Sequence, residues 1–162
     1  MRLVESGHFT AQVQSLTHGE SGKLGGDLDY TLRAFPNHHG ALQAMIRLSQ
    51  REKKAIPAGA KYTVECYFDR ALRFKPDDPA VFMLHGIFLN TQGKLDDAIA
   101  QLEKANQLSP NDANINYNLG LLYFDKKNLA KSKEHAKIAY SLGFPLPGLK
   151  NKLIKAGQWE GD

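Results

Sequence analysis

Two adjacent stretches of the sequence decide the fold, because they align with each other without a gap. Residues 79–112 read PAVFMLHGIFLNTQGKLDDAIAQLEKANQLSPND, and residues 113–146 read ANINYNLGLLYFDKKNLAKSKEHAKIAYSLGFPL. At this offset of 34 residues, Gly86 aligns with Gly120, and other small residues recur in the same register. Small residues in register indicate places where two helices approach closely. A period of this length is typical of one helix hairpin per repeat.

The spacing of apolar residues within the first stretch predicts helices. Gly93 and Pro110 interrupt the chain on either side of a stripe with three- and four-residue steps, formed by Leu95, Ala98, Ile99, Leu102, Ala105 and Leu108. Residues 81–89 are apolar nearly all round, as expected of a helix with neighbours on both sides. The sequence has no run of alternating β-branched residues bounded by turns. We therefore predict an all-α fold.

The residues shared by the two stretches resemble the tetratricopeptide repeat. The positions that carry the resemblance are Gly86, Gly93, Ala98, Ala105 and Pro110 in the first stretch, and Leu119, Gly120, Tyr123 and Ala139 in the second. The chain departs from the family pattern at His85, at Leu102 and Ala136 where an aromatic is usual, and at Phe144 in place of the last proline. The resemblance implies a right-handed superhelix of antiparallel helix hairpins, an α-solenoid.

The same period organises the whole chain as one domain. Pro36 and Pro76 are 40 residues apart, six more than one repeat, and we expect the extra residues in the loop 51–61. The predicted parts are an atypical N-terminal hairpin (1–35), a repeat with a loop insertion (36–78), two further repeats (79–112 and 113–145) and a capping helix (146–162).

Helices at both ends are expected to cover the outer faces of the repeats, which have no neighbour there. The N-terminal hairpin is predicted from helices around residues 10–17 and 28–34. At the other end, Pro147 starts a short helix that is expected to place Leu149, Leu153 and Ile154 on one face, with Trp159 folding over its end.

Two loops look like chemical sites, but their spacing is wrong for one. In FPNHHGAL, residues 35–42, the adjacent His38 and His39 would diverge by about 100° on a helix and could not share a metal ion. This stretch aligns instead with the corners after Pro76 and Pro110. HGESGKLGG, residues 18–26, has only two residues between glycines where a phosphate loop needs four.

No residue pattern in the chain predicts catalysis. Cys66 and His85 fall on predicted helices, where packing is the expected role, and His8, His18 and His135 lack obvious acidic partners. We therefore expect no enzymatic activity, no cofactor and no metal.

The resemblance implies a concave groove lined by the first helix of each repeat. Carried over to this sequence, its residues are Arg47, Ala80, Met83, Ile87, Asn90, Asn114, Tyr117, Asn118, Leu121 and Phe124, with Gln43 and Gln50 beside Arg47. This partly apolar lining with amide edges predicts a protein-protein interaction scaffold that binds a peptide or an amphipathic helix of another protein. The alternative is that the chain's own terminal helices fill the groove.

Charge supports a different class of function. The net charge is +4, and one segment with a single acid, Glu134, holds eight lysines: Lys126, Lys127, Lys131, Lys133, Lys137, Lys150, Lys152 and Lys155. This face could bind an anionic surface, although aromatics for stacking on nucleic-acid bases are scarce there. A third hypothesis is self-association into homo-oligomers through an uncapped repeat edge.

Other sequence features bear on the compartment. A single cysteine excludes an internal disulfide, and no apolar run has the length of about 18 residues that a membrane span requires. The first residues lack the pattern of a signal peptide. The default expectation is the cytoplasm, or the periplasm or secretion if a native leader precedes this sequence.

Overall fold

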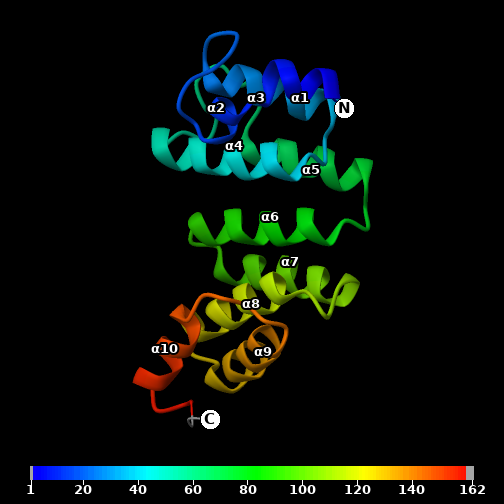
Figure 1. The fold of residues 1–162 in the computed structure, drawn as a ribbon. Coiled ribbons are helices and arrows are strands. Elements are labelled where there is room, and N and C mark those ends of the chain that lie inside the picture. The colour runs from blue at the N-terminus through cyan, green and yellow to red at the C-terminus, as the bar shows by residue number, and fades with distance from the viewer. Residues whose placement is uncertain (1, 160–162) are drawn as a thin grey trace. The chain divides into compact units, whose positions relative to one another are not determined.

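The computed structural model describes residues 2–159, and this part of the chain contains ten α-helices and no strand (Figure 1). The all-α prediction is confirmed. The helices are α1 (Arg2–His8), α2 (Ala11–Gln14), α3 (Leu24–Ala34), α4 (His39–Glu52), α5 (Val64–Phe74), α6 (Pro79–Thr91), α7 (Leu95–Leu108), α8 (Ala113–Asp125), α9 (Leu129–Ser141) and α10 (Gly148–Lys155).

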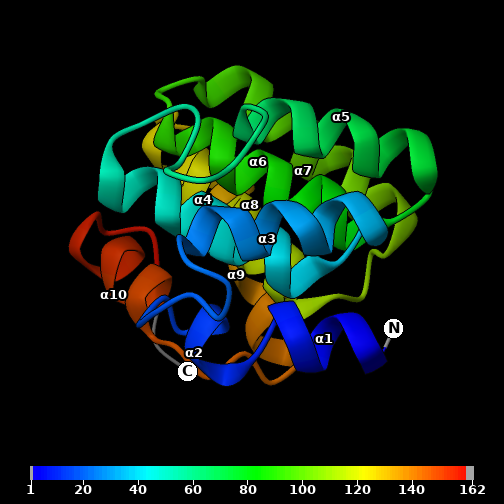
Figure 2. The ribbon, with the colours of Figure 1, turned by 90° about the horizontal axis from the view of Figure 1, so that it is seen from above.

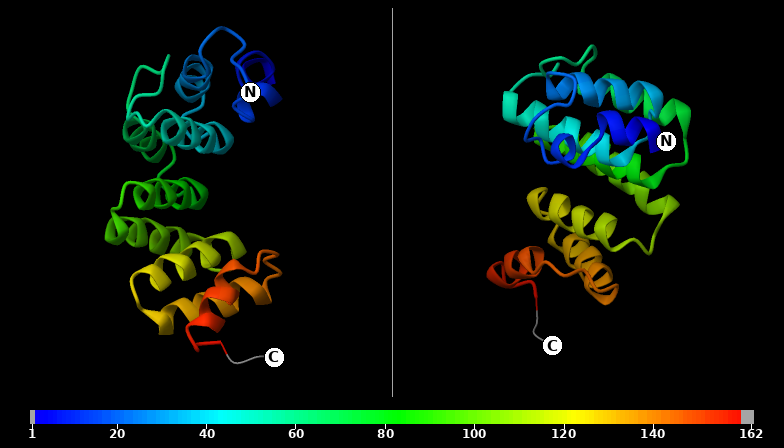
Figure 3. Two further views of the ribbon diagram at one scale, coloured as in Figure 1. Left: turned by 90° about the vertical axis from the view of Figure 1, so that its left-hand side faces the viewer. Right: turned by 45° about the horizontal axis from the view of Figure 1, so that its top comes forward.

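The helices group into two compact units, Met1–Leu84 and His85–Asp162, which divide within α6. In the N-terminal unit, α3 contacts α4, and α4 contacts α5, while α1 and α2 lie against α3 (Figure 2). Its largest fully buried side chains include Leu28, Leu42, Met45 and Phe68. In the C-terminal unit, α8 packs against both α7 and α9, and α10 contacts α8 and α9 (Figure 3).

The small residues aligned between repeats lie at close helix crossings. A Cβ atom added at Gly86 would come within 2.9 Å of the Ala98 carbonyl oxygen. A Cβ atom at Gly120 would lie 3.3 Å from the Ser132 carbonyl oxygen. Glycine at these two positions allows the first helix of a repeat to approach the backbone of the second, as the register of small residues predicts.

Short polar side chains start three helices at the corners between repeats. His38 Nδ1 accepts a hydrogen bond from Ala41 N at the start of α4. Asp78 accepts from Ala80 N and Val81 N at the start of α6. Asp112 does the same for the first amides of α8. Each side chain satisfies amides that have no partner within their own helix.

The N-terminal hairpin differs from the sequence prediction. The expected first helix, around residues 10–17, is reduced to the four residues of α2, and an additional helix, α1, precedes it. The expected second helix begins at Leu24 rather than Leu28, and it therefore includes Gly25 and Gly26. Gly25 is required there: a Cβ atom would come within 2.5 Å of the Ala58 carbonyl oxygen.

The segment between α4 and α5 has no helix. Lys53 ends α4 in the left-handed conformation, with φ of 53°. Glu52 Oε2 then accepts a hydrogen bond of 2.7 Å from Ala58 N and holds the loop back against its own helix. Among the described residues, no helix is long and apolar enough to cross a membrane.

Candidate protein-interaction surface

The predicted groove residues all keep contact with solvent. Arg47, Asn90 and Asn114 are exposed, and the other seven are partly exposed: Ala80, Met83, Ile87, Tyr117, Asn118, Leu121 and Phe124. Residues between them on the same helices, such as Leu84, Phe88, Leu119 and Leu122, are buried. The helical period therefore separates an inner face from an outer, partly apolar face on α6 and α8.

These ten residues are divided between the two units. Arg47, Ala80 and Met83 belong to the N-terminal unit, where Arg47 shares an exposed face of α4 with Gln43 and Gln50. The C-terminal unit holds the other seven, two on α6 and five on α8. We call the seven residues of the C-terminal unit the α6–α8 face: Ile87, Asn90, Asn114, Tyr117, Asn118, Leu121 and Phe124.

Part of the α6–α8 face is covered by α10. Leu149 and Leu153 are fully buried against Ala136, and the partly buried hydrophobics around this cluster are Tyr117, Leu121, Phe124, Tyr140 and Trp159. A Cβ atom at Gly120 would overlap the Leu149 side chain. Ile154, expected on the same face, is instead 49% exposed. It follows Leu149 by five residues, a step that turns a side chain away from the buried stripe.

Aromatic contacts hold the segment that leads into α10. The Tyr117 ring stacks on Phe144 with centroids 4.0 Å apart. The Tyr140 hydroxyl donates to the Leu146 carbonyl oxygen (3.0 Å) and accepts from Lys150 N (3.0 Å). Burial raises the pKa of Tyr140, so the hydroxyl keeps its proton at neutral pH. Trp159 packs edge-on against Tyr140.

The lysine-rich segment is partly neutralised within the chain. Lys126 pairs with Asp96 at 2.8 Å, Lys152 with Asp125 at 3.6 Å, and Lys131 with Glu103 at 3.7 Å. The ammonium groups of Lys127 and Lys152 also lie over the Phe124 ring. These partners reduce the positive charge that the segment presents to an anionic surface.

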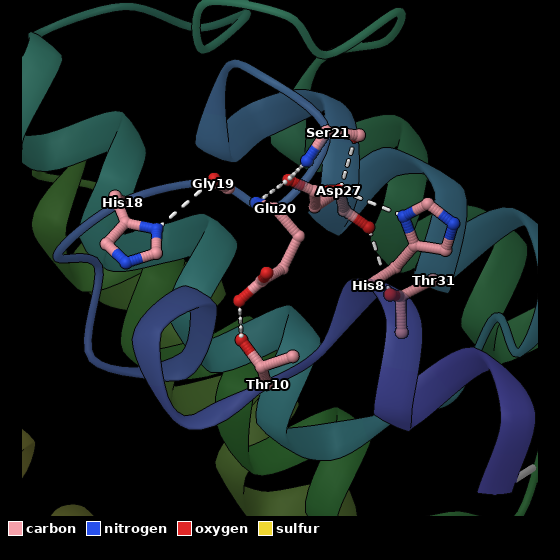
Figure 4. Close-up of polar contacts among 8 residues, drawn as sticks. All are labelled: His8, Thr10, His18, Gly19, Glu20, Ser21, Asp27 and Thr31. Atoms are coloured by element: carbon pink, nitrogen blue, oxygen red, sulfur yellow. Dashed lines mark hydrogen bonds and ion pairs between the residues drawn. The ribbon is translucent and has the colours of Figure 1, made fainter.

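A buried carboxylate organises the glycine-containing loop of the N-terminal unit (Figure 4). Asp27 has no exposed surface and accepts four hydrogen bonds, from His8 Nδ1 (2.9 Å), Ser21 Oγ (2.5 Å), Ser21 N (3.3 Å) and Glu20 N (2.9 Å). Burial alone would raise the pKa of Asp27, but the bonds from Ser21, His8 and Glu20 together lower it below 3.8. Hydrogen bonds to the buried Asp27 carboxylate therefore hold this loop in place.

Sequence reasoning missed this network because its members lie far apart in the chain. His8 and Asp27 are 19 residues apart and come from different helices. The available signal was an aspartate, Asp27, placed between the glycine-rich loop and the predicted helix at residues 28–34.

The adjacent histidines of the FPNHHGAL corner bind different carboxylates. His38 Nε2 lies 3.2 Å from Glu5 of α1, and His39 Nε2 lies 2.9 Å from Asp78, which also accepts from Asn37. Burial would raise the pKa of Asp78, but its bonds to His39 and Asn37 lower it. Within residues 2–159, no group of three His, Cys, Asp or Glu side chains could hold a metal ion.

The fold and its exposed helix faces define the class of helical-repeat interaction proteins. Residues 89–127 match the TPR repeat profile, and residues 113–142 match the Tetratricopeptide repeat profile. Residues 89–142 therefore carry tetratricopeptide repeats. Such repeats are generally interaction modules rather than enzymes, and no catalytic family is indicated.

Solved structures share this fold. PilF of Pseudomonas aeruginosa is 23% identical, with a TM-score of 0.62 over 82% of this chain and 60% of PilF. MamA RS-1 (ArsTM double mutant) is 19% identical, with a TM-score of 0.57 over 74% of this chain and 64% of MamA. MamA MSR-1 is 15% identical, with a TM-score of 0.56 over 86% of this chain and 72% of MamA MSR-1. The chain thus spans less than two thirds of the length of PilF and of MamA RS-1. No curated protein sequence matched.

Proposed function

We propose that this tetratricopeptide-repeat scaffold binds an amphipathic helix or an extended segment of another protein on its outer helix faces. In the C-terminal unit the binding surface is the α6–α8 face. In the N-terminal unit, Arg47, Ala80 and Met83 are proposed as a separate contact surface. The protein performs no chemistry of its own and acts by holding its partner.

One observation carries this proposal: α8 already receives an amphipathic helix. The chain's own α10 inserts Leu149 and Leu153, four residues apart, and keeps Lys152 and Lys155 exposed. The α8 surface thus has the shape and apolar character that a helix with leucines at positions i and i+4 requires. A partner helix would use the same kind of contact on the part of the face that α10 leaves accessible.

The accessible part offers both apolar and hydrogen-bonding groups. Ile87 is partly exposed, and Asn90 and Asn114 are exposed on the same face. Amide side chains donate and accept hydrogen bonds, so they can pair with the backbone of an extended segment. These groups favour a peptide with apolar anchors over a purely anionic ligand.

Capture of partners from a lysate of the source organism tests the proposal. We expect Ile87→Lys and Asn90→Arg each to lose a partner that the wild-type protein retains at both low and moderate salt. The matched control is Leu108→Lys, which places the same charge at an apolar residue on α7 that is 46% exposed. All variants are first checked for helical content by circular dichroism.

Salt separates the proposal from binding through the lysines. Partners held by the lysine-rich segment would dissociate between low and moderate salt, because exposed charges are screened within about 10 Å at 0.1 M. If every captured protein shows that behaviour, or if Leu108→Lys loses the same partner as the two face variants, the α6–α8 face is not the binding surface.

A further inference from the structure

The C-terminal unit also has a polar cavity that the α6–α8 face does not include. Its volume is about 320 Å³, and residues of α7, α8 and α9 line it. The lining residues that matter chemically are Glu103 and Asn106 of α7, Tyr123 of α8, and Lys131, Glu134 and His135 of α9. The polar groups that line this cavity can form hydrogen bonds with a polar ligand.

The protonation of His135 is fixed by its neighbour Asn116. His135 Nδ1 lies 2.9 Å from Asn116 Oδ1. Asn116 is fully buried, and its Nδ2 donates to the carbonyl oxygens of Pro110 (2.8 Å) and Asp112 (3.0 Å). The amide oxygen can therefore only accept, and His135 Nδ1 must donate. Because burial lowers the pKa of His135, the ring is neutral at pH 7 and Nε2 is a hydrogen-bond acceptor.

The Tyr123 ring lies beside this histidine, is only 4% exposed, and has the Lys131 ammonium 4.7 Å from its centroid. The rings of Tyr123 and His135 are parallel within 3°, with centroids 5.7 Å apart. The Tyr123 hydroxyl donates to Glu103 Oε1 and accepts from Lys131 Nζ at 3.0 Å. Burial, together with the bond to Glu103, raises the pKa of Tyr123, so the hydroxyl stays protonated. Lys131 is thus already engaged by two groups of the chain.

The cavity has an excess of acceptors and of negative charge. Glu103 and Glu134 each carry a negative charge, Lys131 is positive, and His135 is neutral, which leaves a net charge of −1 among the titratable lining groups. Asn106 Oδ1 is buried and accepts no hydrogen bond from any described residue. A complementary ligand has one positive charge and several N–H donors.

We propose that this cavity binds an arginine side chain of a partner protein. A guanidinium group is planar, always charged and presents five N–H donors, which match the acceptors of Glu134, His135 and Asn106. A lysine ammonium has only three donors, so it uses fewer of these groups. A carboxylate or phosphate ligand would be repelled by the two glutamates.

Nuclear magnetic resonance titration of the intact protein with N-acetyl-arginine amide tests the proposal. We expect saturable chemical-shift changes at the amides of Tyr123, Glu134 and His135. N-acetyl-citrulline amide has nearly the same shape without the charge, and we expect it to bind at least about tenfold more weakly, because charge-assisted hydrogen bonds are about twice as strong as neutral ones. N-acetyl-lysine amide should fall between the two.

Two variants make the result specific to the cavity. Glu134→Gln should weaken arginine binding by about threefold, the effect of losing one exposed ion pair. Asp97→Asn removes the same charge at an exposed site of α7 outside the cavity lining and should leave binding unchanged. Equal shifts with arginine and citrulline, shifts confined to other residues, or equal weakening by the two variants would each overturn the proposal.

Discussion

The two units hold their terminal helices in place by different chemistry. In the N-terminal unit, α1 is fastened through the His8–Asp27 pair and through Glu5, which binds His38 at the start of α4. In the C-terminal unit, α10 is fastened by Leu149 and Leu153, two fully buried leucines. A helix attached by buried polar groups needs every hydrogen-bond partner, because an unpaired buried polar group lowers the free energy of unfolding. The stability of a helix attached by apolar side chains depends mainly on the apolar area that is buried. The two ends should therefore respond differently to mutation and to acid.

The largest effect is expected from removing an apolar contact of α10. Leu153→Ala leaves a cavity in a fully buried position and should lower the free energy of unfolding by about 3 kcal/mol. Urea unfolding followed by circular dichroism and by the fluorescence of Trp159, the single tryptophan, measures this change. Ile154→Ala is the control, because Ile154 is 49% exposed and should cost less than about 0.5 kcal/mol. Equal losses would mean that α10 is not docked through its leucines.

In the N-terminal unit the corresponding change is Asp27→Ala. It leaves four donors from the loop and α1 without their acceptor and should cost about 2 kcal/mol. Asp69→Ala, an exposed aspartate on α5 of the same unit, is the control and should have little effect. If urea unfolding shows no difference between the two variants, the Asp27 network does not stabilise the unit.

The same contrast explains how much of the fold could be predicted from sequence. The small residues recur at a fixed repeat length, and the apolar residues recur at helical spacing. Both patterns are visible in the sequence, so the all-α repeat architecture and the close helix approach at Gly86 and Gly120 were predictable. The helix α1 was not, because its seven residues, RLVESGH, have no apolar stripe and are held by Glu5 and His8. Polar pairs between distant segments leave no periodic pattern.

The candidate site was predictable to a similar extent. The resemblance to the tetratricopeptide repeat implied ten groove residues, and all of them keep solvent contact. It could not decide whether α10 would cover Tyr117, Leu121 and Phe124, since both an open and a filled groove need an apolar lining. The cavity beside His135 was missed because its hydrogen-bond partner, Asn116, lies on another helix.

A smaller effect compares two glycines that are tightly packed in the two units. Gly25→Ala places a Cβ atom within 2.5 Å of the Ala58 carbonyl oxygen and 3.0 Å of Ala60 N. Backbone atoms cannot move aside easily, so we expect a loss of about 1–2 kcal/mol in the free energy of unfolding. At Gly120 the first atom met belongs to the flexible end of Leu149.

For Gly120→Ala, a shift of that side chain is offset by the higher helix propensity of alanine, about 1 kcal/mol. We expect a net change near zero. Thermal unfolding followed by circular dichroism compares the two variants. A larger loss for Gly120→Ala than for Gly25→Ala would show that α10 is held more rigidly than the loop between α4 and α5.

The smallest effect, and the one that distinguishes the units most directly, is the response to acid. The pKa values of Asp27 and Asp78 are lowered below 3.8, and both residues lie in the N-terminal unit. A carboxylate with a lowered folded-state pKa stabilises the fold at pH values above its ordinary pKa, and this contribution is lost as the pH falls through the folded value. The N-terminal unit should therefore weaken below about pH 4.

Thermal unfolding at pH 6, 4.5 and 3 measures this loss in the wild-type protein and in Asp27→Asn, whose side chain cannot ionise. We expect the variant to be less stable than the wild type at pH 6 and to lose less on acidification, because part of the titrating stabilisation is already absent. Amide signals of α3 should broaden or shift at a higher pH than those of α9. If acid affects α9 first, the leucine-based closure of α10, and not the carboxylate network of α1, is the acid-sensitive end.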